Sequence, residues 1–178
     1  LLPNESLFMP ALMDHLPLIE PLDSAQVTQL VKIICSEPCF ADWGIPRTRL
    51  VESLSRLSRP TLAEAVDAVF RIPADAAGKP RWGDKSPRYV RVIPRLRRVF
   101  PGARFVHIIR DGRDVGLSLH PLGWHGNTVY EIADYWATSV EAGVRDGRPL
   151  GDDVYLEVRY EDLVLRPEAV LRRVCEFL

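Results

Sequence analysis

Long hydrophobic runs, cysteine and lysine are the features that this sequence lacks. No stretch of eighteen apolar residues occurs in the 178, so no segment is expected to span a membrane. The first residues show no basic region followed by an apolar one, as a signal peptide would. The cysteines are Cys35, Cys39 and Cys175, and no second cysteine or histidine pair completes a zinc site with the first two. We therefore expect buried thiols in a reducing, cytoplasmic compartment, and no metal.

Positive and negative charges nearly cancel over the whole chain, but they are unevenly distributed along the sequence. A net charge of −1 argues against a nucleic-acid partner, which would require a basic excess. Of the 23 basic side chains only Lys32, Lys79 and Lys85 are lysines, and the richness in arginine and alanine favours a bacterial, GC-rich source. Residues 81–113 carry ten basic side chains against two acidic ones. Most of these are expected on a solvated helix face, and a few are expected to line a site for an anionic ligand.

Hydrophobic periodicity divides the chain into a helical part and an alternating part. Residues 24–80 are predicted to be mostly helical, and a capping box at Thr61–Glu64 opens one of the helices. From residue 86 onward helices alternate with two strands, 105–109 and 154–158. The first is a compact apolar run typical of a strand buried on both faces. Alternation of this kind indicates an α/β fold with a parallel sheet and crossover helices.

Two further helix starts are predicted from serine caps. Ser24 is predicted to cap a helix that runs through Ile34. Ser86, with Pro87 at the first helical position, is predicted to cap a helix that reaches Phe100 and is kinked at Pro94.

The stretch FVHIIRDGRDVGLS places Arg110 at the carboxyl end of a predicted strand, where open parallel sheets bind ligands. A guanidinium fork matches two phosphate oxygens in a geometry that lysine cannot copy. A tight turn at Asp111 then starts a helix whose free N–H groups favour an anion, and Ser118 can add a hydroxyl. The alternative is a structural ion pair between Arg110 and Asp114.

The spacing of Arg110 and Ser118 behind a strand resembles the 3′-phosphate-binding segment of sulfotransferases that use 3′-phosphoadenosine 5′-phosphosulfate. In that family an arginine and a serine eight residues later hold the 3′-phosphate, and the resemblance implies this role for both residues. A second stretch, VRYEDL at 158–163, resembles the family's "YEDL" segment, whose tyrosine approaches the adenine. The resemblance thus implies that Tyr160 contacts the co-substrate; the alternative is a tyrosine that packs on the sheet.

The stretch GDKSP at 83–87 resembles the "DKTP" or "EKSP" element of bacterial and Golgi-type members. There a lysine reaches the phosphosulfate and steadies charge on the bridging oxygen, which implies a catalytic and a cofactor-binding role for Lys85. An ammonium near the positive end of a helix suits a site where negative charge grows. The alternative is a surface ion pair between Lys85 and Asp84. Otherwise Asp84 is expected to orient Lys85 rather than to act as a base.

The general base is assigned from a third resemblance. LPNESLF at 2–8 resembles the family stretch whose glutamate can take the acceptor's proton, and this implies Glu5 as the first candidate. His120 and His125 are weaker alternatives in the loop after the phosphate helix. Cytosolic members place a histidine base within the lysine motif, where this chain has Pro87. His107, inside an apolar strand, is expected to be a core histidine.

One family feature has no match in this sequence. Members carry a loop like "GxPRSGTTLL" that binds the 5′-phosphosulfate and precedes the glutamate, so we expect it upstream of Leu1 and expect the 178 residues alone to be inactive. The resemblance implies one partial domain over 1–178. Its expected fold is three-layered, related to P-loop kinases, and without the first strand and loop. Residues 24–80 would form an acceptor-side region and 81–178 the 3′-phosphate-binding part.

The resemblance also implies the reaction. A sulfuryl group would pass from 3′-phosphoadenosine 5′-phosphosulfate to an acceptor hydroxyl or amine, without a metal. The acceptor is expected to be a small molecule, a lipid or a carbohydrate, although a phenol or a peptide fits the sequence as well. The loop 120–127, with Trp124, is expected to help shape its pocket. Two alternatives remain open: a P-loop nucleotide kinase relative, and a non-catalytic nucleotide-binding or interaction module.

Overall fold

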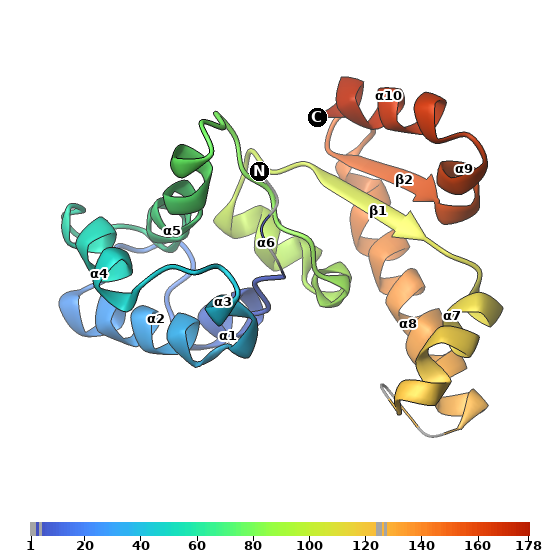
Figure 1. Ribbon diagram of the computed structural model, residues 1–178, viewed down its shortest axis with the longest axis horizontal. Coiled ribbons are helices and arrows are strands. Elements are labelled where there is room, and N and C mark those ends of the chain that lie inside the picture. The colour runs from blue at the N-terminus through green and yellow to red at the C-terminus, as the bar shows by residue number, and fades with distance from the viewer. Residues whose placement is uncertain (1–2, 4, 124–125, 127) are drawn as a thin grey trace. The chain divides into compact units, whose positions relative to one another are not determined.

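The computed structural model describes residues 3, 5–123, 126 and 128–178, and the chain forms two compact units, Leu1–Pro101 and Gly102–Leu178 (Figure 1). The first unit contains α1 (Met9–His15), α2 (Ser24–Ser36), α3 (Pro38–Ala41), α4 (Arg47–Ser55), α5 (Leu62–Ala76), the 3₁₀ turn η1 (Pro87–Arg91) and α6 (Ile93–Val99). The second contains β1 (Phe105–Ile109), α7 (Gly112–Leu119), η2 (His120–Leu122), α8 (Val129–Gly147), η3 (Arg148–Leu150), β2 (Tyr155–Arg159), α9 (Tyr160–Leu165) and α10 (Pro167–Phe177). Within the described ranges, no helix has both the length and the apolar character needed to cross a bilayer.

The first unit is a helical bundle with an aromatic core. Helix α5 starts at the predicted capping box, in which the N–H of Thr61 donates to the Glu64 carboxylate at 2.8 Å and the N–H of Glu64 donates to the Thr61 hydroxyl at 3.3 Å. Its inner face is buried: Leu62, Ala65, Val66, Val69 and Phe70. The ring of Trp82 stacks on that of Phe70 with centroids 4.2 Å apart. The loop that carries Lys85 is therefore anchored to the core three residues before the lysine.

Two predicted helix starts are wrong. The N-cap of α2 is Asp23, not Ser24, because the Asp23 carboxylate accepts the N–H of Gln26 at 2.8 Å and completes a capping box with that glutamine. The helix predicted over residues 86–100 is two separate elements, η1 and α6, and Ser86 makes no capping hydrogen bond. Pro94 lies in the first turn of α6, where its missing N–H costs nothing. The chain restarts its helix there instead of kinking through the proline.

The second unit confirms the α/β class. Strands β1 and β2 pair in parallel, with Phe105 opposite Tyr155, and the connection between them runs through α7 and α8 (Figure 1). Helix α8 packs against β1, and its end lies against the ring of Tyr155. Only glycine fits at position 147 in this contact, since a Cβ there would lie 2.1 Å from a Tyr155 ring carbon. Close approach of helix and strand thus depends on Gly147.

Two expectations about burial are wrong. The strand at 105–109 is not buried on both faces: Ile108 is 52% exposed, because the described elements packed around β1 leave its side chain partly uncovered. The cysteines are not buried thiols. Cys35 and Cys175 are exposed and Cys39 is half-buried, because Cys35 is not among the buried residues of α2 and α10 buries none of its residues. All three thiols are free.

Candidate functional site

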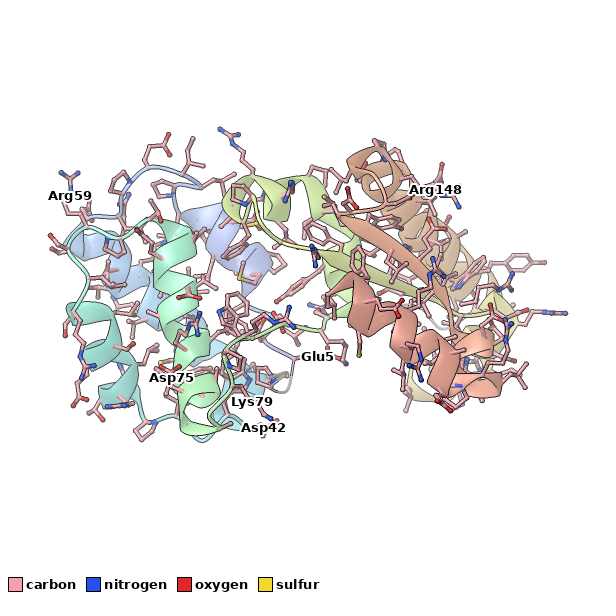
Figure 2. All side chains as sticks on the ribbon, turned by 90° about the horizontal axis from the view of Figure 1, so that it is seen from above. Glu5, Asp42, Arg59, Asp75, Lys79 and Arg148 are labelled. Atoms are coloured by element: carbon pink, nitrogen blue, oxygen red, sulfur yellow. The ribbon has the colours of Figure 1, made fainter. Side chains whose placement is uncertain are left out.

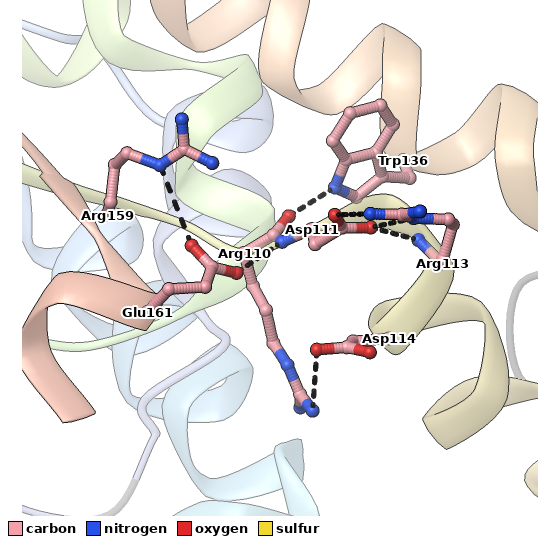
Figure 3. Close-up of polar contacts among 7 residues, drawn as sticks. All are labelled: Arg110, Asp111, Arg113, Asp114, Trp136, Arg159 and Glu161. Atoms are coloured by element: carbon pink, nitrogen blue, oxygen red, sulfur yellow. Dashed lines mark hydrogen bonds and ion pairs between the residues drawn. The ribbon is translucent and has the colours of Figure 1, made fainter. Parts of the chain in front are cut away.

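The backbone where β1 ends is held by two other helices. The carbonyl of Arg110 accepts a hydrogen bond from the indole Nε1 of Trp136 in α8, at 3.0 Å. The N–H of Asp111 donates to a carboxylate oxygen of Glu161 in α9, at 2.8 Å (Figure 3). Because side chains from α8 and α9 hydrogen-bond to neighbouring backbone groups of Arg110 and Asp111, the direction in which the Arg110 side chain leaves the strand is fixed.

Asp111 caps the helix that follows. Its carboxylate accepts the N–H of Arg113 at 2.9 Å and two bonds from the Arg113 guanidinium, at 3.0 and 2.7 Å. Hydrogen bonds from the Arg113 side chain and then from its backbone N–H hold the pKa of the Asp111 carboxyl well below its usual range. The next residue must be small, since a Cβ on Gly112 would lie 2.8 Å from the ring of Trp136.

The guanidinium of Arg110 is far less engaged than its backbone. Its nearest acidic partner is Asp114, at 3.7 Å, which is an ion pair too long to be a hydrogen bond (Figure 3). The guanidinium carbon lies 4.8 Å from the centroid of the Tyr160 ring, in cation–π range. Its Nε is buried, and no described residue accepts a hydrogen bond from it. Donors that are buried without partners are what an absent anion would satisfy.

The structure brings together some of the residues predicted to bind the co-substrate. Arg110 and Tyr160 are in contact, although 50 positions separate them in the sequence. Ser118 lies in α7, four residues after Asp114, so the two share a helix face on the side that Arg110 approaches. Its hydroxyl is exposed and makes no hydrogen bond with a described residue. The alternative Arg110–Asp114 pair exists, but only as a loose contact.

In the first unit, Glu5 and Lys85 form an ion pair across 80 positions of sequence. The ammonium of Lys85 donates to a carboxylate oxygen of Glu5, and the lysine side chain stays 66% exposed. The alternative pairing of Lys85 with Asp84 is not formed. Figure 2 shows Glu5 and Arg59 at opposite ends of this unit. Both predicted catalytic side chains thus meet, while their roles stay predictions.

Asp84 points away from Lys85 and into the protein. Its carboxylate accepts a hydrogen bond from the hydroxyl of Ser6, and the same hydroxyl is bonded to that of Tyr89. Burial raises the pKa of Asp84, although these hydroxyls and nearby backbone N–H groups act against the shift. Burial, and then the charge of Asp84, raises the pKa of Tyr89. Sequence reasoning missed Ser6, which lies inside the stretch 2–8 that it singled out, and Tyr89, which lies two residues after the GDKSP stretch.

The histidines are placed differently from one another. His107 behaves as the predicted structural residue: its Nδ1 lies 2.5 Å from the hydroxyl of Tyr155, and burial lowers its pKa. His120 is exposed in η2 of the second unit, whereas Glu5 and Lys85 belong to the first. His125 and Trp124 lie outside the described residues. Across the described part of the chain, no group of three or more histidine, cysteine or carboxylate side chains is arranged to hold a metal ion.

Comparison with known proteins shows the family. A family model described as "Sulfotransferase family" matches residues 9–178. The chain belongs to the sulfotransferase family. Curated sulfotransferases that it resembles include protein-tyrosine sulfotransferase A of Caenorhabditis elegans, 32% identical over 104 residues, and the protein-tyrosine sulfotransferase of Drosophila melanogaster, 29% identical over 107. Each alignment covers 56% of this chain but only 27% and 21% of the relative, so the chain spans about a quarter of their length.

Solved sulfotransferase domains share the fold. The sulfotransferase domain from the curacin biosynthetic pathway superposes with a TM-score of 0.58 at 22% identity, over 98% of this chain and 63% of that domain. The domain from the Synechococcus PCC 7002 olefin synthase gives the same score and identity, over 99% of this chain and 70% of its own length. The family and fold predicted from the motifs are confirmed. The donor, the acceptor and the role of each residue stay predictions.

Proposed function

We propose that this sulfotransferase chain moves a sulfuryl group from 3′-phosphoadenosine 5′-phosphosulfate to an acceptor hydroxyl or amine. The observation that carries the proposal is the Arg110 guanidinium, which has a buried Nε without a partner and lies over the ring of Tyr160. In a sulfotransferase, a doubly charged 3′-phosphate beside an adenine has the chemistry that would satisfy both side chains.

In the second unit we assign the adenosine end of the co-substrate. Arg110 would donate to two oxygens of the 3′-phosphate, for which its loose pair with Asp114 leaves the donors available. Ser118 would add a hydroxyl donor from the last turn of α7, and Tyr160 would pack against the adenine. The residues fit the group, because the orphaned Nε and the exposed serine hydroxyl are donors and a phosphate accepts only.

In the first unit we assign the chemistry of transfer, for which the bound co-substrate supplies the sulfuryl group. The Glu5 carboxylate would exchange the Lys85 ammonium for the acceptor's O–H or N–H and take up its proton. The Lys85 ammonium, released from Glu5, would place positive charge where the leaving oxygen becomes negative. The hydroxyl of Ser86 is buried without a described partner beside Lys85 and can donate in the same region. Positioning and charge neutralisation then account for catalysis, with no metal.

The acceptor is proposed only by class. A hydroxyl or amine on a small molecule, lipid or carbohydrate fits the expectation from the sequence. The names of the curated relatives add a tyrosine side chain in a protein. A tyrosine-containing peptide is therefore the first acceptor to assay, followed by simple phenols, alcohols and amines.

Nucleotide binding and group transfer together test the proposal. We expect the protein to bind adenosine 3′,5′-bisphosphate more tightly than AMP in a calorimetric titration, and the full-length gene product to pass ³⁵S label from the co-substrate to an acceptor. A kinase relative would instead bind ATP with Mg²⁺, show no preference for a 3′-phosphate, and transfer ³²P from the γ-position. A binding module would keep the 3′-phosphate preference and transfer neither label from the full-length gene product.

A further inference from the structure

Among the polar and charged residues in the described part of the chain, Ser6 is the one with no exposed area at all. Its hydroxyl contacts both the carboxylate of Asp84 and the hydroxyl of Tyr89. We call these three residues the Ser6 node. A buried hydroxyl with two polar partners is a costly arrangement to leave incomplete, since each unpaired partner then loses its hydrogen bond inside the protein.

The hydrogen bonds of the node have one consistent direction. A serine hydroxyl carries one hydrogen, which it donates to the Asp84 carboxylate, so Tyr89 donates its own hydrogen to the serine oxygen. The other Asp84 oxygen is buried and has no hydrogen-bond partner among the described residues. Ser6 therefore supplies the one side-chain donor through which Asp84 is tied to the N-terminal segment.

The node lies one residue away from each member of the Glu5–Lys85 pair. Ser6 follows Glu5, and Asp84 precedes Lys85, so the two segments meet twice in succession. The inner contact, between Ser6 and Asp84, is buried; the outer contact, between Glu5 and Lys85, faces solvent. An exposed ion pair between long side chains is weak and mobile by itself, because ordering both chains offsets its Coulomb energy. A buried contact in the adjacent position supplies the order that the exposed pair lacks.

The geometry points to Ser6, Asp84 and Tyr89 as positioning residues that hold the Glu5 carboxylate and the Lys85 ammonium in a fixed position relative to each other. The inference rests on the proposed function for the catalytic purpose of this arrangement, but the arrangement itself does not depend on that function. Neither Ser6 nor Tyr89 is expected to touch a substrate, since each acts through its neighbour. Loss of the node should therefore lower kcat for sulfuryl transfer, by about ten- to a hundredfold for a misplacement on the order of 1 Å, with KM for the co-substrate little changed.

The scarcity of lysine allows a test that needs no activity. Reductive methylation with ¹³C-formaldehyde labels only Lys32, Lys79, Lys85 and the chain's amino terminus, and lysine-to-arginine variants assign each signal. We expect Glu5→Gln to shift the Lys85 dimethylamine signal toward those of the other two lysines. Ser6→Ala and Tyr89→Phe should each produce at least half of that shift, and Ser6→Thr, which keeps a hydroxyl, should restore most of the original position.

Ser53→Ala is the matched control. Ser53 is half-buried in the same unit and donates to the carbonyl of Ala68 at 3.2 Å, away from both catalytic segments, so its loss should leave the Lys85 signal in place. If Ser6→Ala fails to fold, as its thermal unfolding will show, Tyr89→Phe decides, because it removes one oxygen from a half-buried ring. A Lys85 signal that stays in place in Tyr89→Phe while Glu5→Gln moves it would overturn the inference. Since the signal is read without nucleotide, failure of the proposed function would leave this result unaffected.

Discussion

Arg110 combines a backbone that is fully engaged with a guanidinium that is not. Its carbonyl and the following N–H are bonded to Trp136 and Glu161, whereas its side chain has a loose ion pair and a ring contact. Sequence reasoning could find Arg110 and Tyr160, because strand periodicity and the order of the motifs mark them. It could not find Trp136 or Glu161 as supports, because their roles depend on how α8 and α9 pack beside β1, which no local pattern encodes.

Asp111 makes the stability of this turn dependent on pH. Its pKa is lowered in the folded protein, so its contribution to the free energy of unfolding is complete above about pH 5, and is lost as pH falls from the usual aspartate range near 3.9 toward the lowered folded value. We predict that the wild type loses more stability between pH 5 and pH 2.5 than Asp111→Asn does, measured by urea unfolding at each pH.

Arg113 provides the control for that prediction, since its hydrogen bonds are the main cause of the lowered pKa. Arg113→Ala should flatten the same part of the pH profile, and the double variant should add little to either single change. Two single effects that add in full would show that the two side chains titrate independently, contrary to this account.

At the scale of elements, the decisive contacts are places where a helix comes unusually close to its neighbour. Gly112 in α7 and Gly147 in α8 both face aromatic rings at distances that exclude a Cβ. Helix existence was predictable from periodicity, and the capping box at Thr61 was correct. The helix predicted over 86–100 was wrong because two prolines, Pro87 and Pro94, each suit a first turn and together favour two short elements.

Two glycines of α7 form a matched pair for testing this packing. A Cβ at Gly112 would lie 2.8 Å from Trp136, whereas a Cβ at Gly116 would lie 4.0 Å from Ile132, in ordinary contact. We predict that Gly112→Ala lowers the free energy of unfolding by about 1–3 kcal/mol through overpacking. Gly116→Ala should raise it by about 0.4–1 kcal/mol, because alanine restricts the unfolded chain and favours the helix. Chemical denaturation measures both, and equal effects would contradict the close approach.

At the scale of the molecule, the chain belongs to the sulfotransferase family, and its proposed functions are distributed over two compact units. The fold class and the family were predictable, because the alternation of strands and helices and the order of three motifs are visible over long stretches of the sequence. The extent to which β1 and the cysteines are buried was not predictable. An apolar run shows that a segment can be buried, but how much of Ile108 is covered depends on the elements that pack around it.

The measurement that tests the central claim most directly is the affinity ratio for adenosine 3′,5′-bisphosphate over AMP in Arg110→Ala. We predict that this variant loses about 1.5–3 kcal/mol of preference for the 3′-phosphate, which is roughly ten- to a hundredfold in the ratio, with AMP affinity nearly unchanged. Arg172→Ala is the matched control, because Arg172 is exposed in the same unit and pairs i,i+4 with Glu168 as Arg110 does with Asp114. A ratio that stays at the wild-type value in Arg110→Ala, or falls equally in Arg172→Ala, would contradict the assignment.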